Sequence, residues 1–286
     1  MIYRLIAQWQ QKADVMRMCR LLGVSRSGYY TAQQRQRAAP KVCSASVHLQ
    51  AAFAASGGNY GSRRLRAALQ SQGRRIGRYR VRSLMKRHGL KPRWRRKFVH
   101  TTDSRHSLPV ASNILDRSFN PPAADRAWAC DITYIRTRSG WLYLAAVMDL
   151  FSRKLIGWAM APTMPAQLVC TALQMAITLR RPKPGLVVHS DRGCQYASET
   201  HSTLLSEHGF LASMSRKGNC WDNAVMERFF LNLKMERVWQ RSYANSMEAI
   251  QDITDYIVGF YNTERLHSTL GYRSPRDFEQ QCQAAA

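Results

Sequence analysis

Three acidic residues are placed where a carboxylate could do chemistry: Asp131, Asp191 and Glu227. Asp191 ends the apolar run LVVHS, which predicts a buried strand, and an Arg-Gly turn follows it. Asp131 begins a β-rich run, directly after the letters WAC. Residues just beyond strand ends line the ligand crevice of an open α/β sheet. If the two strands are neighbours, the two aspartates face each other at this edge.

Glu227 lies in a run that predicts a helix over residues 221–240. At about 100° per residue, Phe230, Leu231 and Lys234 share its side of the helix, so we expect a half-buried carboxylate. Burying an unpaired charge is costly, and Lys234 is too far along the helix for a direct i, i+4 pair. A helix laid across the sheet edge would bring Glu227 to the two aspartates.

Three converging carboxylates repel one another unless a cation neutralises them. Hard oxygen ligands favour Mg²⁺ or Mn²⁺. Two such ions about 3.5–4 Å apart can activate an attacking oxygen and stabilise a leaving one at phosphorus. The seven cysteines are scattered without a CxxC pair, which argues against a zinc site or a disulfide framework and for a reducing cytosol.

Taken singly, each acidic residue has a structural alternative. An aspartate at a strand end is more often a turn former or a helix cap than a functional group. We therefore expect Asp222 to be the N-cap of its helix and Asp149 to lie in a hairpin turn.

The residues that follow position 120 predict an α/β mixed sheet covered by helices. Three β-rich runs with short turns indicate an antiparallel meander, and alternating helices and strands follow it. The expected strands are 128–137, 140–150, 153–161, 185–191 and one near 210–214, and the expected helices are 165–180, one near 197–208, 221–240 and one at about 246–267.

Charge separates the N-terminal third from the rest of this 286-residue chain. The 88 residues between Asp14 and Asp103 contain no acid and 21 Lys plus Arg, whereas the whole chain has a net charge of +25. So much charge of one sign repels itself, and a polyanion relieves the repulsion. We expect nucleic acid rather than an anionic membrane surface, because no basic amphipathic helix has a broad apolar face.

Residues 1–31 read as helices joined by a tight turn at Gly23, with Ser25 as the N-cap of the second. This is the helix-turn-helix pattern.

Two basic amphipathic helices follow, ended by Gly73 and Gly89, and then a basic strand or wing at 91–97. The candidate DNA contacts in this region are Arg63, Arg64, Arg66, Arg78, Arg80, Arg82, Lys86, Arg87, Arg93, Arg95, Arg96 and Lys97.

The motifs WACDITYI, VVHSDRGCQY and SRKGNCWDNAVMERFFLNLK resemble those of insertion-sequence transposases of the IS3 family, second-reading-frame (OrfB) type. These are relatives of retroviral integrases with an RNase H-like core. Asp191 and Glu227 are separated by 35 residues, the interval of that family. The segments YGSRRLRAAL and YNTERLHSTLGYRSP are also similar to the family's, so the resemblance covers about residues 15–280.

The resemblance implies that Asp131, Asp191 and Glu227 are a metal-binding DDE triad, served by two Mg²⁺ ions for which Mn²⁺ can substitute. It implies that Lys234 contacts the terminal DNA, with positional roles for Arg192 and Asn223. The implied chemistry is nicking at a transposon end, followed by attack of the freed 3′-hydroxyl on a target phosphate.

The implied partners are double-stranded end and target DNA, a homo-oligomer on DNA, and a first-reading-frame (OrfA) protein as partner or fusion. The N-terminus is too short and polar for a signal peptide, and the longest apolar run is far below the roughly 20 residues that span a bilayer, so we expect a cytoplasmic protein without a membrane partner. Two other functions stay open: an RNase H-like nuclease that cuts without joining, and a non-catalytic DNA-binding regulator.

The expected domains follow the changes in composition. They are an N-terminal helix-turn-helix segment at 1–42, a basic DNA-binding domain at 43–105, a linker at 106–121, the catalytic core at 122–240 and a helical extension at 241–286.

Overall fold

The structure is a computed structural model, and it describes residues 2–37, 43–93, 109–216 and 220–284. Contacts divide the chain into two compact units, Met1–Ala51 and Ala52–Ala286. None of the helices within the described ranges is long and apolar enough to cross a membrane.

The first unit contains the predicted helix-turn-helix. The Asp14 carboxylate accepts a hydrogen bond from the Arg17 amide and begins one helix, and the Ser25 hydroxyl accepts one from the Gly28 amide and begins the next. Between them Gly23 has a φ of +63°, a conformation that costs glycine little. The helices are α1 (Ile2–Trp9), α2 (Val15–Leu21) and α3 (Arg26–Arg37).

The second unit begins with basic helices. Leu65 and Leu69 of α5 are buried, as are Val81 and Leu84 of α6, and the two helices pack on each other. Each helix ends two residues before the expected glycine, and the glycine itself has a left-handed φ, which confirms the two predicted stops. Residues 94–97 of the predicted wing lie outside the described residues. The bounds of the basic helices are α5 (Ser62–Ser71) and α6 (Arg78–Arg87), and the preceding helix α4 (Ser44–Ala55) spans the boundary between the two units.

A five-stranded mixed sheet follows, in the order β3-β2-β1-β4-β5. The first three strands form the predicted antiparallel meander, and β4 and β5 add to it in parallel. The strand β1 therefore lies beside β4, as the convergence of the two aspartates requires. The strands are β1 (Ala127–Thr137), β2 (Gly140–Asp149), β3 (Leu155–Ala161), β4 (Val187–Ser190) and β5 (Leu211–Met214).

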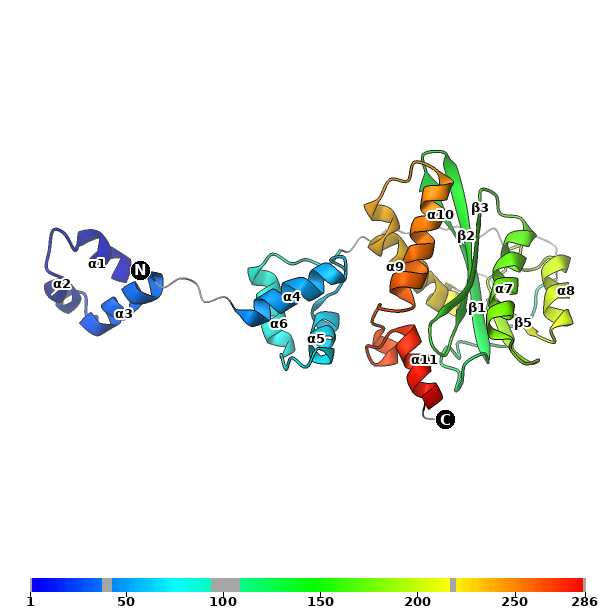
Figure 1. Cartoon of the computed structure of the whole chain (residues 1–286), viewed down its shortest axis with the longest axis horizontal. Coiled ribbons are helices and arrows are strands. Elements are labelled where there is room, and N and C mark those ends of the chain that lie inside the picture. The colour runs from blue at the N-terminus through cyan, green and yellow to red at the C-terminus, as the bar shows by residue number, and fades with distance from the viewer. Residues whose placement is uncertain (1, 38–42, 94–108, 217–219, 285–286) are drawn as a thin grey trace. The chain divides into compact units, whose positions relative to one another are not determined.

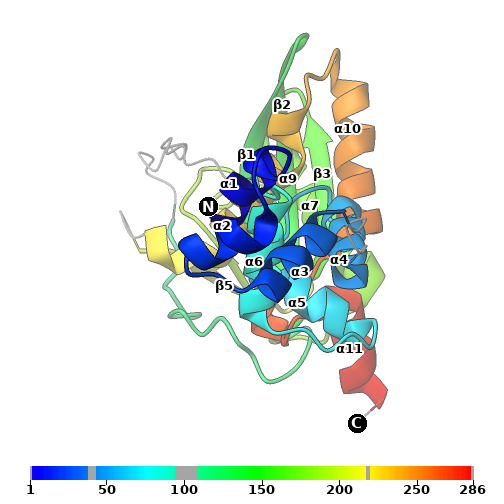
Figure 2. The ribbon, with the colours of Figure 1, turned by 90° about the vertical axis from the view of Figure 1, so that its left-hand side faces the viewer.

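Helices cover both faces of the sheet, with α7 and α8 on one side and α9 and α10 on the other (Figures 1 and 2). Alternation along β1 sends Ala129 and Ile135 toward α9 and Trp128 toward α7. Gly157 of β3 lets α7 approach closely, because a Cβ there would collide with the Ala172 carbonyl oxygen. The helices are α7 (Ala166–Arg180), α8 (Glu199–Glu207), α9 (Ala224–Glu236), α10 (Ser246–Asp255) and α11 (Pro275–Ala284).

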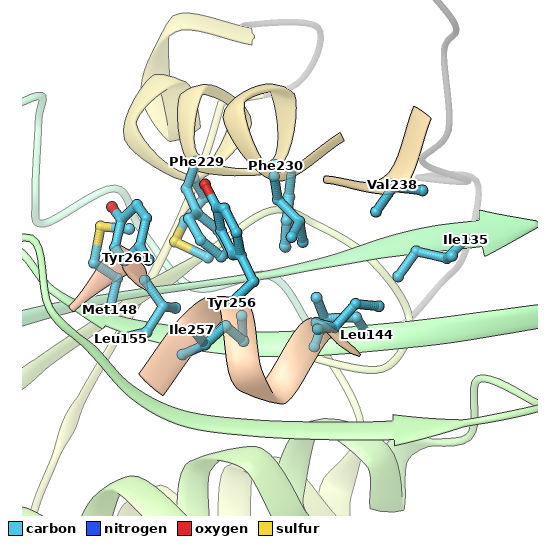
Figure 3. Close-up of a cluster of buried hydrophobic side chains, with 14 of the residues drawn as sticks. Ile135, Leu144, Met148, Leu155, Phe229, Phe230, Val238, Tyr256, Ile257 and Tyr261 are labelled. Carbon is cyan, nitrogen blue, oxygen red and sulfur yellow. The ribbon is translucent and has the colours of Figure 1, made fainter. Parts of the chain in front are cut away.

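Figure 3 shows how α9 is held on the sheet. Phe229 and Phe230 of α9 point toward the strands, where they meet Leu144 of β2 and the rings of Tyr256 and Tyr261 from the C-terminal segment. The Phe229 and Tyr261 rings pack edge to face with centroids 4.8 Å apart. This packing fixes the helix that carries Glu227 against the strand that carries Asp131.

Two predicted helices differ from the expectation. The run 221–240 consists of a 3-10 turn, α9 and a second 3-10 turn at Val238–Gln240. The run 246–267 is α10 followed by a π-helix at Tyr256–Tyr261 and a turn. After the π-helix, the Asn262 side chain hydrogen-bonds both the amide and the carbonyl of Leu155 on β3, at 2.9 Å each, and so attaches this segment to the sheet.

The two aspartates with structural alternatives have different outcomes. Asp149 lies at the β2–β3 turn as predicted, and its Oδ1 accepts hydrogen bonds from the Phe151 and Ser152 amides. Asp222 is not the N-cap of α9, so that prediction is wrong. Asn223 is at the cap position, without a side-chain cap, because the Asp222 carboxylate is taken up by arginines.

Candidate active site

Asp131 and Asp191 occupy equal positions on neighbouring parallel strands. The last paired residues of β1 and β4 are Ala129 and His189, and each aspartate lies two residues further along its chain. Asp131 is therefore in the interior of β1 rather than at its beginning, which corrects the expectation from the sequence. It reaches the crevice because β4 ends early and leaves this part of β1 at the open edge of the sheet.

The three carboxylates interact electrostatically. Burial raises the pKa of Asp131 well above its usual range, and the charges of Asp191 and then Glu227 raise it further. The Ile132 amide, which donates to Asp131 Oδ1 at 2.8 Å, and the charge of Lys234 act in the opposite direction. The fold thus brings like charges from β1, the loop after β4 and α9 within range of electrostatic interaction with one another.

Glu227 differs from its prediction in one respect. Its side chain is exposed rather than half-buried, because Met226, Phe229, Phe230 and Leu233 supply the packed side of α9. In the part of the chain that the structure describes, no group of three or more His, Cys, Asp or Glu side chains is close enough to hold a metal ion. The carboxylates therefore approach one another without forming a closed ligand cage.

The donor set nevertheless fits a hard divalent cation. All three groups are carboxylates, which Mg²⁺ and Mn²⁺ prefer to thiolate or imidazole ligands. The raised pKa of Asp131 means that its anion is destabilised where it lies, and a cation beside it would remove this penalty. In addition, Oδ1 of Asn223 is buried and has no hydrogen-bond partner among the described residues. The Asn223 amide lies 3.5 Å from the carbonyl oxygen of Cys130, the residue before Asp131.

Lys234 lies beside the site, two helical turns after Glu227. Its ammonium is 4.6 Å from the centroid of the Tyr134 ring, and it attracts the Asp131 carboxylate. Burial lowers the pKa of Lys234. Sequence reasoning singled out Lys234 but missed Tyr134, since nothing in the spacing of β1 shows that α9 lies alongside it.

Arg192 contacts the protein backbone. Its Nε donates a hydrogen bond of 2.6 Å to the Ser215 carbonyl oxygen, which ties the loop after β4 to the end of β5. The same loop is fixed by the amide of Gly193, which donates to Asp191 Oδ1 at 2.9 Å. These contacts suit the positional role predicted for Arg192, which stays a prediction.

His189 was not identified from the sequence. Its ring is fully buried, and its two nitrogens lie 2.9 Å from the Ser213 hydroxyl and 3.2 Å from the Ser215 hydroxyl. Burial lowers the pKa of His189 to about 4, so the ring is neutral near pH 7. The network joins β4 to β5 two residues before Asp191, and it thereby fixes where that carboxylate leaves the sheet.

Asp222 forms a second contact set that the sequence did not show. Its fully buried carboxylate pairs with Nε of Arg216 at 3.0 Å and Nε of Arg117 at 2.9 Å, and it accepts a hydrogen bond from Asn113. Hydrogen bonds from Arg216 hold the pKa of Asp222 far below its usual range. These ion pairs and hydrogen bonds thus hold the segment before α9 against residues 113–117. Partners more than 100 positions apart leave no trace in local periodicity.

Most of the described candidate DNA contacts are exposed. Arg64 is the exception, since it is half-buried with its guanidinium 5.6 Å from the Tyr60 ring centroid. Arg95, Arg96 and Lys97 lie outside the described residues. The exposed residues are Arg63, Arg66, Arg78, Arg80, Arg82, Lys86, Arg87 and Arg93.

Family models match three parts of the chain. A model described as an HTH-like domain matches residues 45–98, and two models described as an integrase core domain match residues 121–220 and 208–275. The integrase-core matches cover the sheet, all three carboxylates and the helices around them. They confirm the predicted fold class of a basic helical region followed by an integrase-type mixed sheet.

Curated relatives match over nearly the whole length. The chain is 41% identical over 265 residues to the insertion element IS600 uncharacterized 31 kDa protein of Shigella sonnei, covering 92% of this chain and 97% of that protein. It is 40% identical over 285 residues to transposase InsF for insertion sequence IS3A of Escherichia coli K12, covering 98% of each.

Solved structures give a weaker likeness. The simian T-cell lymphotropic virus intasome matches at 15% identity and a TM-score of 0.48, over 75% of this chain and 70% of that one. The HTLV-2 integrase catalytic core domain in complex with magnesium matches at 15% identity and a TM-score of 0.42, over 55% of this chain and 98% of that one. At these scores the likenesses carry no argument about this chain.

Proposed function

The chain belongs to the IS3 family of insertion-sequence transposases, and from this premise we propose that Asp131, Asp191 and Glu227 bind the catalytic metal ions. As a transposase with an integrase core, it cuts DNA at transposon ends and transfers the strands. The observation that supports the triad is the effect on Asp131, whose pKa is raised by both of the other carboxylates.

We propose two Mg²⁺ ions at this site, with Mn²⁺ as a substitute. When bound, such a pair activates the attacking oxygen and stabilises the leaving one in an in-line displacement at phosphorus. The protein's own contribution is to hold three carboxylates at fixed positions. Asp131 is held by the sheet and Asp191 by the Gly193 amide, while Glu227 is carried by a helix that packs on the same sheet.

Lys234 is proposed to bind a phosphate of the terminal DNA. Its ammonium lies close enough to Asp131 for the two charges to interact, so a strand contacting Lys234 passes the carboxylates. The exposed cations of α5 and α6, with Arg93 beyond them, are proposed to hold the flanking duplex through its backbone. Asn223 and Arg192 are proposed to position the loops that carry the acids.

Several features of the biological assembly also remain proposals. We propose double-stranded end and target DNA as ligands, a homo-oligomer that pairs two ends, and a first-reading-frame protein as partner or fusion. The proposed location is the bacterial cytoplasm. The domain limits 1–42, 43–105, 106–121, 122–240 and 241–286 are retained as part of this proposal.

Strand cleavage and joining on labelled end DNA with Mg²⁺ or Mn²⁺ tests the triad. Glu227→Gln keeps the size of the side chain and removes its charge, so both products should disappear while DNA binding persists. Glu199→Gln is the matched control, because Glu199 is also an exposed glutamate in the first turn of a helix but lies outside the triad. Mg²⁺ should raise the melting temperatures of the wild type and of the control by more than it raises the melting temperature of Glu227→Gln. Wild-type joining by Glu227→Gln would overturn the assignment.

A further inference from the structure

The β1–β2 hairpin carries a row of aromatic and cationic side chains beside the carboxylates. The Lys234 ammonium lies 4.6 Å from the Tyr134 ring centroid. The Tyr134 ring packs edge to face on Trp141 with centroids 5.1 Å apart, and the Arg136 guanidinium lies 5.0 Å from the Trp141 centroid. Trp141 is 43% exposed. The row therefore ends in an accessible indole with a cation on each side of the aromatic pair.

The position of the row relative to the carboxylates follows from the register of α9 on β1. Glu227 interacts with Asp131, and Lys234 lies over Tyr134, so helix and strand run side by side in the same direction. Seven helical residues advance about 10 Å and three strand residues also advance about 10 Å, so the two spacings agree. The aromatic pair thus begins about 10 Å from the carboxylates along the hairpin.

Part of this arrangement stabilises the hairpin itself. Arg136 and Trp141 are directly opposite each other in the β1–β2 register, and such cross-strand pairs stabilise a sheet. The contact between Lys234 and the Tyr134 ring is not required for the stability of the hairpin. Lys234 comes from α9, and it connects the aromatic pair to the site of phosphate chemistry instead of to the hairpin turn.

We propose that Tyr134 and Trp141 form a stacking platform for unpaired nucleobases at the end of the bound DNA. Exposed aromatic rings bordered by cations are the usual means of binding single-stranded nucleic acid, because bases stack on the rings while the cations hold the backbone. A paired base buries its faces in the duplex, so the platform can bind only bases that have left the duplex. The inference rests on the proposed function, in which the three carboxylates hold the reacting phosphate.

The distance limits which bases the platform can take. Stacked nucleotides advance about 3.4 Å along one strand, so about 10 Å corresponds to some three nucleotides. The platform therefore binds bases within about three nucleotides of the phosphate at the carboxylates.

Binding of two end duplexes to the full-length protein tests the platform. One duplex is fully paired, and in the other the last three nucleotides on the processed strand are left unpaired. The measurement uses Glu227→Gln without divalent metal, so that affinity is read without cleavage. We expect the unpaired end to bind about tenfold more tightly than the paired one, the lower range for stacking bases on aromatic rings. Trp141→Ala in the same background should bring this ratio close to one.

The controls separate stacking from stability. Trp141→Phe keeps an aromatic face and should keep most of the preference, and Tyr134→Leu should reduce it. Leu179→Ala removes a comparably exposed apolar side chain from α7 and should leave the ratio unchanged. If Trp141→Ala and Trp141→Phe both preserve the preference, or if the parent has none, the platform is overturned. Neither result depends on the triad, which only the cleavage assay addresses.

Discussion

The N-terminal third and the catalytic core use charge in opposite ways. Between Asp14 and Asp103 the chain has 21 basic residues and no acid, and the described cations of α5 and α6 are mostly exposed. In the core the two signs are nearly balanced, and most buried acids have a basic partner. A surface of one sign is suited to a polyanion, whereas a balanced interior holds a fold together.

The core's structural acids show this pattern clearly. Glu236 pairs with Arg265, with both side chains almost fully buried. Asp252 pairs with Arg237 and Arg241. The three carboxylates proposed to bind metal depart from the pattern, because the charges that most affect Asp131 are other carboxylates. An excess of one sign, basic in the N-terminal third and acidic around Asp131, therefore coincides with the two places at which we propose that this protein binds its ligands.

Removing one partner of a buried pair should have the largest effect. Arg265 donates to both oxygens of Glu236, at 2.7 and 2.8 Å. Arg265→Leu leaves a buried carboxylate without this partner and should lower the free energy of unfolding by about 3–5 kcal/mol. Denaturant titration measures it. The double variant Arg265→Leu/Glu236→Met should recover much of the loss, and no recovery would mean that packing, not charge, holds this region.

Removing one of the carboxylates proposed to bind metal should leave the fold intact and abolish the reaction. Asp191→Asn should slow cleavage by about 100- to 1000-fold or more, as the loss of one charge-stabilising group does in other enzymes. Its affinity for end DNA and its melting temperature should stay close to those of the wild type. A parallel loss of binding and cleavage, measured by gel shift and strand release, would count against a catalytic role.

Asp222 should show a pH-dependent contribution to stability. Its arginine partners hold its pKa below the ordinary value of 3.8, so the stabilisation is present above pH 3.8 and is lost as the pH falls through the lower folded-state pKa. Asp222→Asn should cost about 1 kcal/mol near neutral pH, because Arg117 and Arg216 are half-exposed and solvent screens the pairs.

Melting curves of wild type and Asp222→Asn between neutral pH and pH 2 check the sign. The two should differ most above pH 4 and converge in acid. A difference that grows as the pH falls contradicts the assigned direction.

Replacing a single exposed arginine in the basic helices α5 and α6 should have the smallest effect. Arg80→Ala should weaken binding to all DNA sequences alike and reduce the dependence of log K on log salt by about one. The control is Arg241→Ala, which removes an arginine of similar exposure that is paired with Asp252 in the core. If both variants change the dependence of log K on log salt equally, the basic helices α5 and α6 are not the DNA-binding surface.

The sequence predicted those features of the fold that depend on local patterns. The meander, the buried strand before Asp191 and the two glycine stops follow from periodicity and turn chemistry. The approach of Asp131 to Asp191 depends on β1 and β4 being neighbours, and the sheet order confirms that they are. The spacing of Asp191 and Glu227 carried the family resemblance.

The features that the sequence missed depend on partners far away along the chain. Glu236 and Arg265 are 29 positions apart, and Asp222 and Arg117 are 105 apart, so neither pair appears in a helical or strand period. The exposure of Glu227 was mispredicted because angular position on an isolated helix does not show which side the sheet covers. His189 was missed because its hydroxyl partners are on another strand.

The register of β1 on β4 also determines when activity can appear during synthesis. The basic helices can form from short, local stretches of chain, whereas the crevice forms only when residues 131, 191 and 227 have all been synthesised. At the usual speed of a ribosome, residue 227 follows residue 93 by on the order of ten seconds. During this interval a nascent chain carries its DNA-binding helices but lacks the third acid. We therefore expect a product terminated before α9 to be unable to transfer strands, because it lacks Glu227, the third carboxylate proposed to bind metal.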